Sequence, residues 1–278
     1  MMPPARLCFP GGQLPLGHRT YVMGILNVTP DSFSDGGRWP DPRRALAHAR
    51  RMLRDGADLI DVGGESTRPG AARIPAREEL RRVLPVVEAL AAEGVLVSID
   101  TSKAAVAEAA FRAGAKILND VTALRGDRRM ARVAAKAGVA VILMHMKGRP
   151  RTMQKAPRYR DIVREITDFF LKSLKSALRA GIPRDRILLD PGIGFGKLPE
   201  HNVEILRRLG EFRGLGCALA IGTSRKSFIG HFLGRRVDER VSGTAATVAA
   251  AILRGADVVR VHDVREMVDV ARMTDLLR

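Results

Sequence analysis

Residues 59–103, LIDVGGESTRPGAARIPAREELRRVLPVVEALAAEGVLVSIDTSK, contain the pattern that decides the fold of this chain. Two short and mostly apolar runs, Leu59–Gly63 and Leu96–Thr101, are typical of parallel strands that are buried on both faces. The segment between them repeats its apolar residues at the spacing of one helix face: Leu80, Val83, Leu84, Val87 and Leu90. The stretch therefore predicts a strand, a crossover helix and a second strand parallel to the first.

The same unit recurs along the chain. Eight short runs qualify as strands: Tyr21–Val28, Leu59–Gly63, Leu96–Thr101, Lys116–Val121, Val139–His145, Ile187–Asp190, Ala218–Gly222 and Val258–His262. The segments between these predicted strands begin and end with residues that are typical of helix termini. After the first run, Asp41 can cap a helix that has Pro42 in its first position and Gly56 as its stop. A further helix is expected over about 159–180, with Gly181 ending it.

Eight alternating units predict an α/β chain folded as a single (β/α)8 TIM barrel, and the length of 278 residues suits one such domain. An open, doubly wound sheet is the competing architecture, but the even repetition favours closure. Residues 1–20 stand outside the alternation, and we expect them to form a small β-hairpin that caps the bottom of the barrel. The predicted barrel domain spans residues 21–278.

Composition narrows the classes of function. No apolar run approaches the roughly 20 residues that span a bilayer, and residues 1–18 lack the apolar core of a signal peptide. Cys8 and Cys217 lie far apart without CxxC spacing, so we expect neither a disulfide framework nor a zinc site. These features predict a cytoplasmic protein with no membrane partner.

The chain carries 47 Lys and Arg against 30 Asp and Glu, a formal net charge of +17. A basic RNA-binding protein on a barrel scaffold is one reading of this charge. The basic residues are dispersed along predicted helices, however, and aromatic residues make up 4% of the chain, too few for a base-stacking platform. We therefore expect small anionic substrates and no nucleic acid.

Polar residues gather where the predicted strands end, which is where barrel enzymes place their active sites. An anion site is available from the side chains of Asn27, Arg68, Arg260 and His262. Buried carboxylates, Asp100 and Asp190, would lie beside it and could accept hydrogen bonds from a planar amino-heterocycle. No strand end carries an evident nucleophile. The residues by themselves indicate group transfer with an anionic leaving group.

Eight motifs resemble those of the dihydropteroate synthase family, in its order and spacing from about residue 20 to the end. They are MGILNVTPDSFSDGG (23–37), DVGGESTRPGA (61–71), SIDTSK (98–103), NDV (119–121), LMHMKGRPRTMQ (143–154), LLDPGIGFGK (188–197), GTSRKSFIG (222–230) and VVRVHDV (258–264). The resemblance implies that the chain joins (7,8-dihydropterin-6-yl)methyl diphosphate to 4-aminobenzoate, giving 7,8-dihydropteroate and diphosphate in folate biosynthesis. It also implies a homodimer and a target for sulfonamides.

The resemblance assigns roles to matching positions. The implied pterin-binding residues are Asp100, Asn119, Met144, Asp190, Phe195, Lys226 and Arg260. The implied diphosphate-binding residues are Asn27, Arg68, Arg260 and His262. The implied aminobenzoate-binding residues are Thr67, Pro69, Phe195, Lys226 and Ser227. Asn27 would bind the Mg2+ that bridges the diphosphate, and the implied catalytic residues are Asp100, Lys226 and Arg260. For Lys197, the last residue of its motif, a solvated charge is one reading.

The mechanism that the resemblance implies needs no covalent nucleophile. Diphosphate leaves first, and the aniline nitrogen then attacks a pterin cation whose charge Asp100 stabilises. Two other enzyme-fold readings compete with it. A pterin-binding methyltransferase barrel shares the pocket but should lack the SRKSF and STRPG segments in this form, and a paralogue could keep the fold without synthase activity. Intact Asn27, Arg68, Asp100 and Lys226 argue against the second reading.

Overall fold

The computed structural model describes residues 4–29, 41–66, 73–148 and 152–278. Eight parallel strands close into a barrel in the order β10-β3-β4-β5-β6-β7-β8-β9, so the predicted (β/α)8 architecture is confirmed. Its strands are β3 (Tyr21–Asn27), β4 (Leu59–Gly63), β5 (Val97–Asp100), β6 (Ile117–Asp120), β7 (Ala140–Met144), β8 (Ile187–Asp190), β9 (Ala218–Ile221) and β10 (Val258–Val261). Each lies within the run that the sequence predicts.

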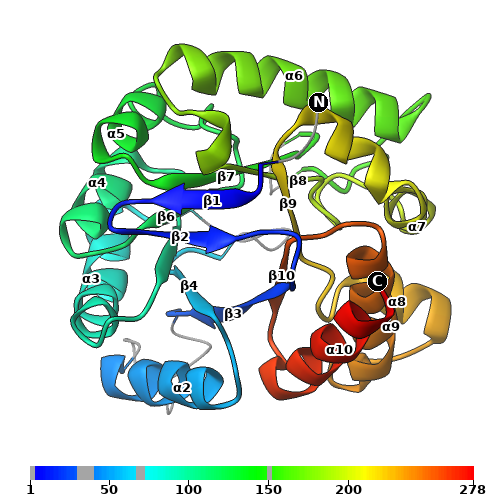
Figure 1. The fold of residues 1–278 in the computed structure, drawn as a ribbon, viewed down its shortest axis with the longest axis horizontal. Helices are drawn as coiled ribbons and strands as arrows, with labels where there is room; N and C mark the ends of the chain where they lie inside the picture. The colour runs from blue at the N-terminus through cyan, green and yellow to red at the C-terminus, as the bar shows by residue number, and fades with distance from the viewer. Residues whose placement is uncertain (1–3, 30–40, 67–72, 149–151) are drawn as a thin grey trace.

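Helices surround the barrel on the outside (Figure 1). They are α2 (Pro42–Arg54), α3 (Ala76–Ala92), α4 (Ala104–Arg112), α5 (Met130–Ala137), α6 (Ile162–Arg179), α7 (Pro199–Arg207), α8 (Ser227–Leu233), α9 (Val241–Leu253) and α10 (Val264–Leu277). Asp41 caps α2 by accepting a hydrogen bond from the backbone of Arg43, as expected. Helix α6 begins later than its apolar pattern indicates, because Asp161 caps it by accepting from the backbone N–H groups of Val163 and Arg164.

The N-terminal hairpin consists of antiparallel strands β1 (Arg6–Phe9) and β2 (Gly12–Pro15). It lies across one end of the barrel (Figure 1). Leu7 of β1 packs into the buried cluster of the barrel interior. The Tyr21 hydroxyl donates a hydrogen bond of 2.7 Å to the carbonyl oxygen of Pro15, which ties the hairpin to the first barrel strand. The hairpin therefore closes the bottom and leaves the opposite end, where the strands finish, for a site.

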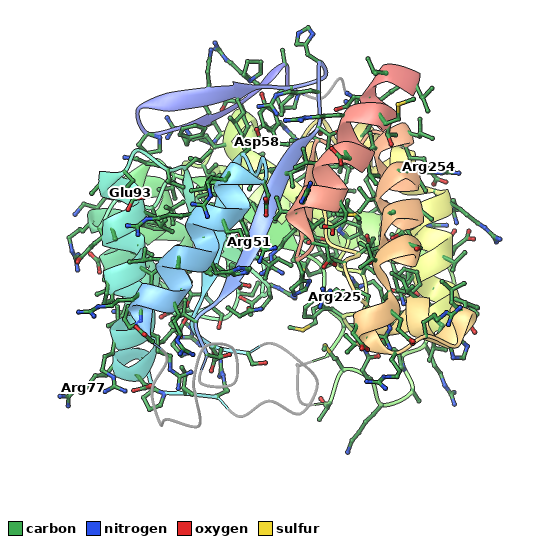
Figure 2. All side chains as sticks on the ribbon, turned by 90° about the horizontal axis from the view of Figure 1, so that it is seen from below. Arg51, Asp58, Arg77, Glu93, Arg225 and Arg254 are labelled. Carbon is green, nitrogen blue, oxygen red and sulfur yellow. The ribbon has the colours of Figure 1, made fainter. Side chains whose placement is uncertain are left out.

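Inward-facing side chains change from apolar to polar along the strands. The bottom of the interior is filled by a buried cluster: Leu7, Leu16, Tyr21, Met23, Leu59, Ile117, Ala140, Ile142, Leu188, Ala218, Ala220 and Val258. Two residues further along four of these strands, the same face carries Asp61, Asn119, Asp190 and Arg260. Figure 2 shows the two ends, with Asp58 near the hairpin and Arg225 at the other end. On these four strands, the inward-facing side chains therefore change from apolar to polar at the same level of the barrel.

Among the described helices, none is long and apolar enough to cross a membrane.

The loop after β8 packs tightly on the loop after β7. The backbone N–H of His145 donates to the carbonyl oxygen of Asp190 at 2.8 Å. Gly192 has a φ of +69°, and a Cβ atom there would lie 2.0 Å from the carbonyl oxygen of His145. Glycine is required at this position both by its backbone conformation and by the close approach of the neighbouring chain.

We predict that Gly192→Ala destabilises the protein more than Gly181→Ala. Gly181 also has a positive φ, of +93°, but a Cβ atom there meets nothing within 4 Å. Backbone strain should cost either variant about 1–2 kcal/mol, and the clash at Gly192 should add about 1–3 kcal/mol. Urea denaturation gives the free energies of unfolding, and equal losses in the two variants would contradict the argument.

Candidate active site

The centre of the polar end holds an arginine between two carboxylates. Arg260 donates from Nε to Oδ2 of Asp61 at 2.6 Å and from Nη2 to Oδ2 of Asp100 at 2.9 Å. Asn119 donates from Nδ2 to the same Oδ2 of Asp61 at 2.9 Å. These four side chains come from β10, β4, β5 and β6, and they meet because each follows the buried apolar layer on the inward face. The structure brings together three predicted residues and adds Asp61.

The acidity of Asp100 is set by its surroundings. Burial raises the pKa of Asp100 to about 8, and the negative charge of Asp61 acts in the same direction. The guanidinium of Arg260 opposes this shift by favouring the ionised form. Asp100 therefore gains and loses its proton near neutral pH, which is unusual for a carboxyl group and typical of functional sites.

A second side of the site combines apolar groups with a lysine. The Nζ of Lys226 lies 4.3 Å from the centroid of the Phe195 ring. Burial lowers the pKa of Lys226 to about 8, and the charge of Arg260 adds to the effect. Phe195 packs against a small buried cluster consisting of Val121, Met144, Met146 and Met153. A flat ring with polar edges would find an apolar wall here and charged partners beside it.

Asp190 faces this wall from the end of β8. Its Oδ1 accepts a hydrogen bond of 2.7 Å from the backbone N–H of Gly192, so the tight loop after β8 also orients this carboxyl group. Burial raises the pKa of Asp190, while the charges of Lys226, Lys197 and Arg260 oppose the shift. The predicted pterin-binding set thus lies within one end of the barrel, on six different strands or the loops that follow them.

His262 is a neutral hydrogen-bonding group in this site. Burial and the charge of Arg260 lower the pKa of His262 to about 4. The Ser224 hydroxyl oxygen accepts from the backbone N–H of His262 at 3.1 Å and lies 3.0 Å from Nδ1. The hydroxyl proton is then free to bond Nδ1, which leaves the ring proton on Nε2. His262 can therefore offer an N–H to an anion, but not a full positive charge.

The remaining predicted residues divide into two groups. Asn27 is the last residue of β3, and Ser227 is the exposed first residue of α8, directly after Lys226. Thr67, Arg68 and Pro69 lie outside the described residues, so their predicted roles stay predictions.

The reading of Lys197 as a solvated charge is wrong. The residue is 3% exposed, and its Nζ lies 3.0 Å from Nδ1 of His145 and donates to the carbonyl oxygen of Phe195 at 3.0 Å. Burial lowers the pKa of Lys197 to about 7. The amine joins the loops after β7 and β8, and its place directly after the glycine-rich turn at 192–196, which follows the end of β8, was the sequence signal for this.

Asp61 was also absent from the residues expected in the site. The sequence feature that could have identified it is the two-residue alternation of side chains along β4. This alternation places Asp61 on the same inward face as Leu59. The sequence pattern alone gave no partner for it, because Asn119 and Arg260 are 58 and 199 residues away.

Comparisons with known proteins identify the family of this chain. The family described as pterin binding enzyme matches residues 23–262. Dihydropteroate synthase of Escherichia coli (strain K12) is 47% identical over 266 residues, which cover 95% of this chain and 94% of that protein. A crystal structure of Yersinia pestis dihydropteroate synthase with a sulfonamide drug has a TM-score of 0.93 at 47% identity, and covers 98% of this chain and 99% of that one.

Two structures of Xanthomonas albilineans dihydropteroate synthase are similar as well. The one with 4-aminobenzoic acid has a TM-score of 0.91 at 45% identity, and the one with 7,8-dihydropteroate has a TM-score of 0.88 at 43% identity. Both matches cover 98% of this chain and 98% of that one.

The chain belongs to the dihydropteroate synthases, within the pterin-binding enzyme family. It is therefore a transferase, and the family resemblance of its eight motifs is confirmed. In the described part of the chain, these motifs share one location, because their residues lie in the strands or directly after the carboxyl ends of the strands.

Lys197→Met should lose stability relative to the wild type as pH rises. Folding lowers the pKa of Lys197, so between about pH 7 and 10 the unfolded chain binds a proton that the folded chain has released. The free energy of unfolding of the wild type therefore rises with pH, by up to about 1.4 kcal/mol per pH unit, and the variant lacks this contribution.

Urea denaturation at several pH values measures this difference. Lys172→Met, at an exposed position on α6, is the matched control and should follow the wild type. A stability difference for Lys197→Met that does not change with pH would contradict the assignment.

Proposed function

We propose that this chain joins (7,8-dihydropterin-6-yl)methyl diphosphate to 4-aminobenzoate at the end of the barrel opposite the hairpin. The observation that carries the proposal is the juxtaposition of the Asp61–Arg260–Asp100 cluster with the apolar wall of Met144 and Phe195. Family membership supports the same reaction. The structures of relatives with 4-aminobenzoic acid and with 7,8-dihydropteroate supply a substrate and a product of matching chemistry.

The pterin is proposed to lie against the apolar wall with its polar edge toward Asp100, Asn119 and Asp190. A carboxyl group and a carboxamide can both accept and donate, so they suit the mixed donors and acceptors of an aminopterin edge. Lys226 lies between this edge and the aminobenzoate, with Phe195 beside it and Ser227 following it in the chain. The proposed aminobenzoate contacts include Thr67 and Pro69 from outside the described residues.

The proposed reaction breaks the bond between the pterin methylene carbon and the diphosphate oxygen, which keeps the electron pair. Arg260, the Nε2–H of His262 and, from outside the described residues, Arg68 stabilise the negative charge on the leaving diphosphate. Ionised Asp100 stabilises the positive charge left on the pterin. The aniline nitrogen then forms the new bond to the methylene carbon, and its proton passes to water.

Asn27 fits the proposed Mg2+ that accompanies the diphosphate. Its carboxamide makes no hydrogen bond within the described part of the chain, and an amide oxygen is a ligand that this ion accepts. Within the same residues, no group of three or more His, Cys, Asp or Glu could hold a metal ion. One protein oxygen would suit an ion that takes most of its ligands from water and phosphate, and when bound the ion would supply positive charge to the leaving group.

A homodimer and a cytoplasmic location are also proposed. Large apolar side chains are exposed near the end of the chain, among them Leu253, Met273, Leu276 and Leu277. Such side chains are typical of a surface that a second copy covers. Sedimentation equilibrium at a single mass of 30.3 kDa would contradict the dimer. Both cysteines are free, which suits a reducing compartment.

A coupling assay tests the reaction directly. Purified protein, the dihydropterin diphosphate, labelled 4-aminobenzoate and Mg2+ should give labelled dihydropteroate, and EDTA should abolish it. Arg260→Ala should lower kcat/KM by at least about 100-fold, and Lys226→Ala should weaken pterin binding. A sulfonamide should compete with 4-aminobenzoate.

Arg51→Ala is the control for the assay, because its side chain is 73% exposed on α2, outside the barrel (Figure 2). Absence of product with wild-type protein that binds the dihydropterin in calorimetry would favour a paralogue without synthase activity or a methyltransferase.

The pH dependence of kcat/KM should report the ionisation of Asp100. Because the pKa of this group is raised to about 8, kcat/KM should rise with pH as the carboxylate forms and stabilises positive charge on the pterin. Loss of the proton from Lys226, whose pKa is lowered to about 8, should give the falling limb, so the profile should be a narrow bell centred near pH 8. Asp100→Asn should remove the rising limb and keep the falling one, and an unchanged profile would contradict the role of Asp100.

A further inference from the structure

Asp61 is a fully buried carboxylate whose two oxygens have different surroundings. Its Oδ2 accepts both the Arg260 Nε–H at 2.6 Å and the Asn119 Nδ2–H at 2.9 Å. Its Oδ1 is buried and has no hydrogen-bond partner in the described residues. Burying a charge with one unsatisfied oxygen costs stability, and such a group at the centre of a site suggests a functional reason.

The two hydrogen bonds fix two of the groups proposed to contact the pterin. Arg260 stands on β10, and β3 separates this strand from β4, so its guanidinium has to cross the interior to reach Asp61. Bonds from Nε to Asp61 and from Nη2 to Asp100 together define the plane of the guanidinium. For Asn119, donation from Nδ2 to Asp61 determines the orientation of the amide, which leaves Oδ1 as the acceptor for a ligand.

We propose that Asp61 is a positioning residue of the synthase site, which holds the guanidinium of Arg260 and the carboxamide of Asn119 in the geometry that receives the pterin. The inference rests on the proposed function and adds a residue to it. Asp61 itself, buried beneath these groups, acts through them.

The charge of Asp61 has a second consequence, for Asp100. The charged and titratable groups that face Asp100 come from every side of the site: Asp61 of β4, Glu79 of α3, Asp120 of β6, Lys226 after β9 and Arg260 of β10. Among the charges, Asp61 contributes most to raising the pKa of Asp100. Removing its charge also leaves Arg260 with Asp100 as its remaining carboxylate partner, and both effects favour ionised Asp100.

Two substitutions separate the charge of Asp61 from its hydrogen bonds. In Asp61→Asn, the amide oxygen can take the place of Oδ2 and accept both donors, while the NH2 group replaces the unpartnered Oδ1. This variant removes the charge and keeps the shape. Asp61→Ala removes both hydrogen bonds and leaves Arg260 and Asn119 free to turn.

Asp61→Asn should shift the rising limb of the pH profile of kcat/KM to lower pH by about one unit or more, with the falling limb unchanged. Asp61→Ala should lower kcat/KM by about 10- to 100-fold and weaken binding of the dihydropterin diphosphate in calorimetry. The double variant Asp61→Asn with Asp100→Asn should show no rising limb, as for Asp100→Asn alone.

Asp257→Asn is the matched control, because Asp257 is a buried carboxylate just before β10, at the hairpin end of the barrel, where it accepts from the backbone of Leu219. A purely structural role would be shared by this control, which should lose stability without moving the pH profile. An Asp61→Asn variant with the wild-type rising limb, or a folded Asp61→Ala variant with wild-type kinetics, would overturn the inference.

If Asp61→Ala fails to fold, Asp61→Asn carries the test through its pH profile. Failure of the wild-type protein to form dihydropteroate would instead overturn the proposed function, so the two failures are distinguishable.

Discussion

The parallel pairing of β10 with β3 closes the sheet, and the geometry of the site depends on that closure. Four residues of each strand are in register, from Val258 beside Tyr21 to Val261 beside Gly24. Without this ladder, Arg260 would stand on one edge strand of an open sheet, and Asp61 would stand one strand in from the opposite edge. With it, they approach to 2.6 Å across the interior, although 199 residues separate them in the chain.

Closure of the barrel also separates apolar side chains at one end of the interior from charged side chains at the other. The hairpin and the lower residues of the strands fill one end with apolar side chains, so the charged groups above them are cut off from water on that side. A low local dielectric strengthens every charge–charge interaction there, and burial favours the neutral forms of Asp100, Lys226 and Lys197. Asp100, Lys226 and Lys197 consequently titrate near pH 7–8, far from the ordinary ranges of Asp and Lys.

The same burial constrains how the charges are arranged. Arg260 has two carboxylate partners, and Lys197 is surrounded by a ring nitrogen and carbonyl oxygens. Both arrangements hold a polar group rigidly at a strand end, which is the condition for stabilising charge that develops during a reaction. The basic surface of the chain, with a net charge of +17, suits substrates that carry a diphosphate or a carboxylate.

The sequence by itself determined the local elements and the chemistry of the strand ends. Apolar runs and helix punctuation located all eight barrel strands and the Asp41 cap, because both depend on residues that are close in the chain. The family motifs likewise placed Asp100, Asn119, Asp190, Lys226 and Arg260 at strand ends. Only the tertiary structure decided which of these groups touch, that Asp61 joins Arg260 to Asn119, and that Lys197 is buried rather than solvated. The physical reason is that burial and charge pairing arise from strands brought together by closure of the barrel, and no local pattern encodes the identity of a partner so far away in the chain.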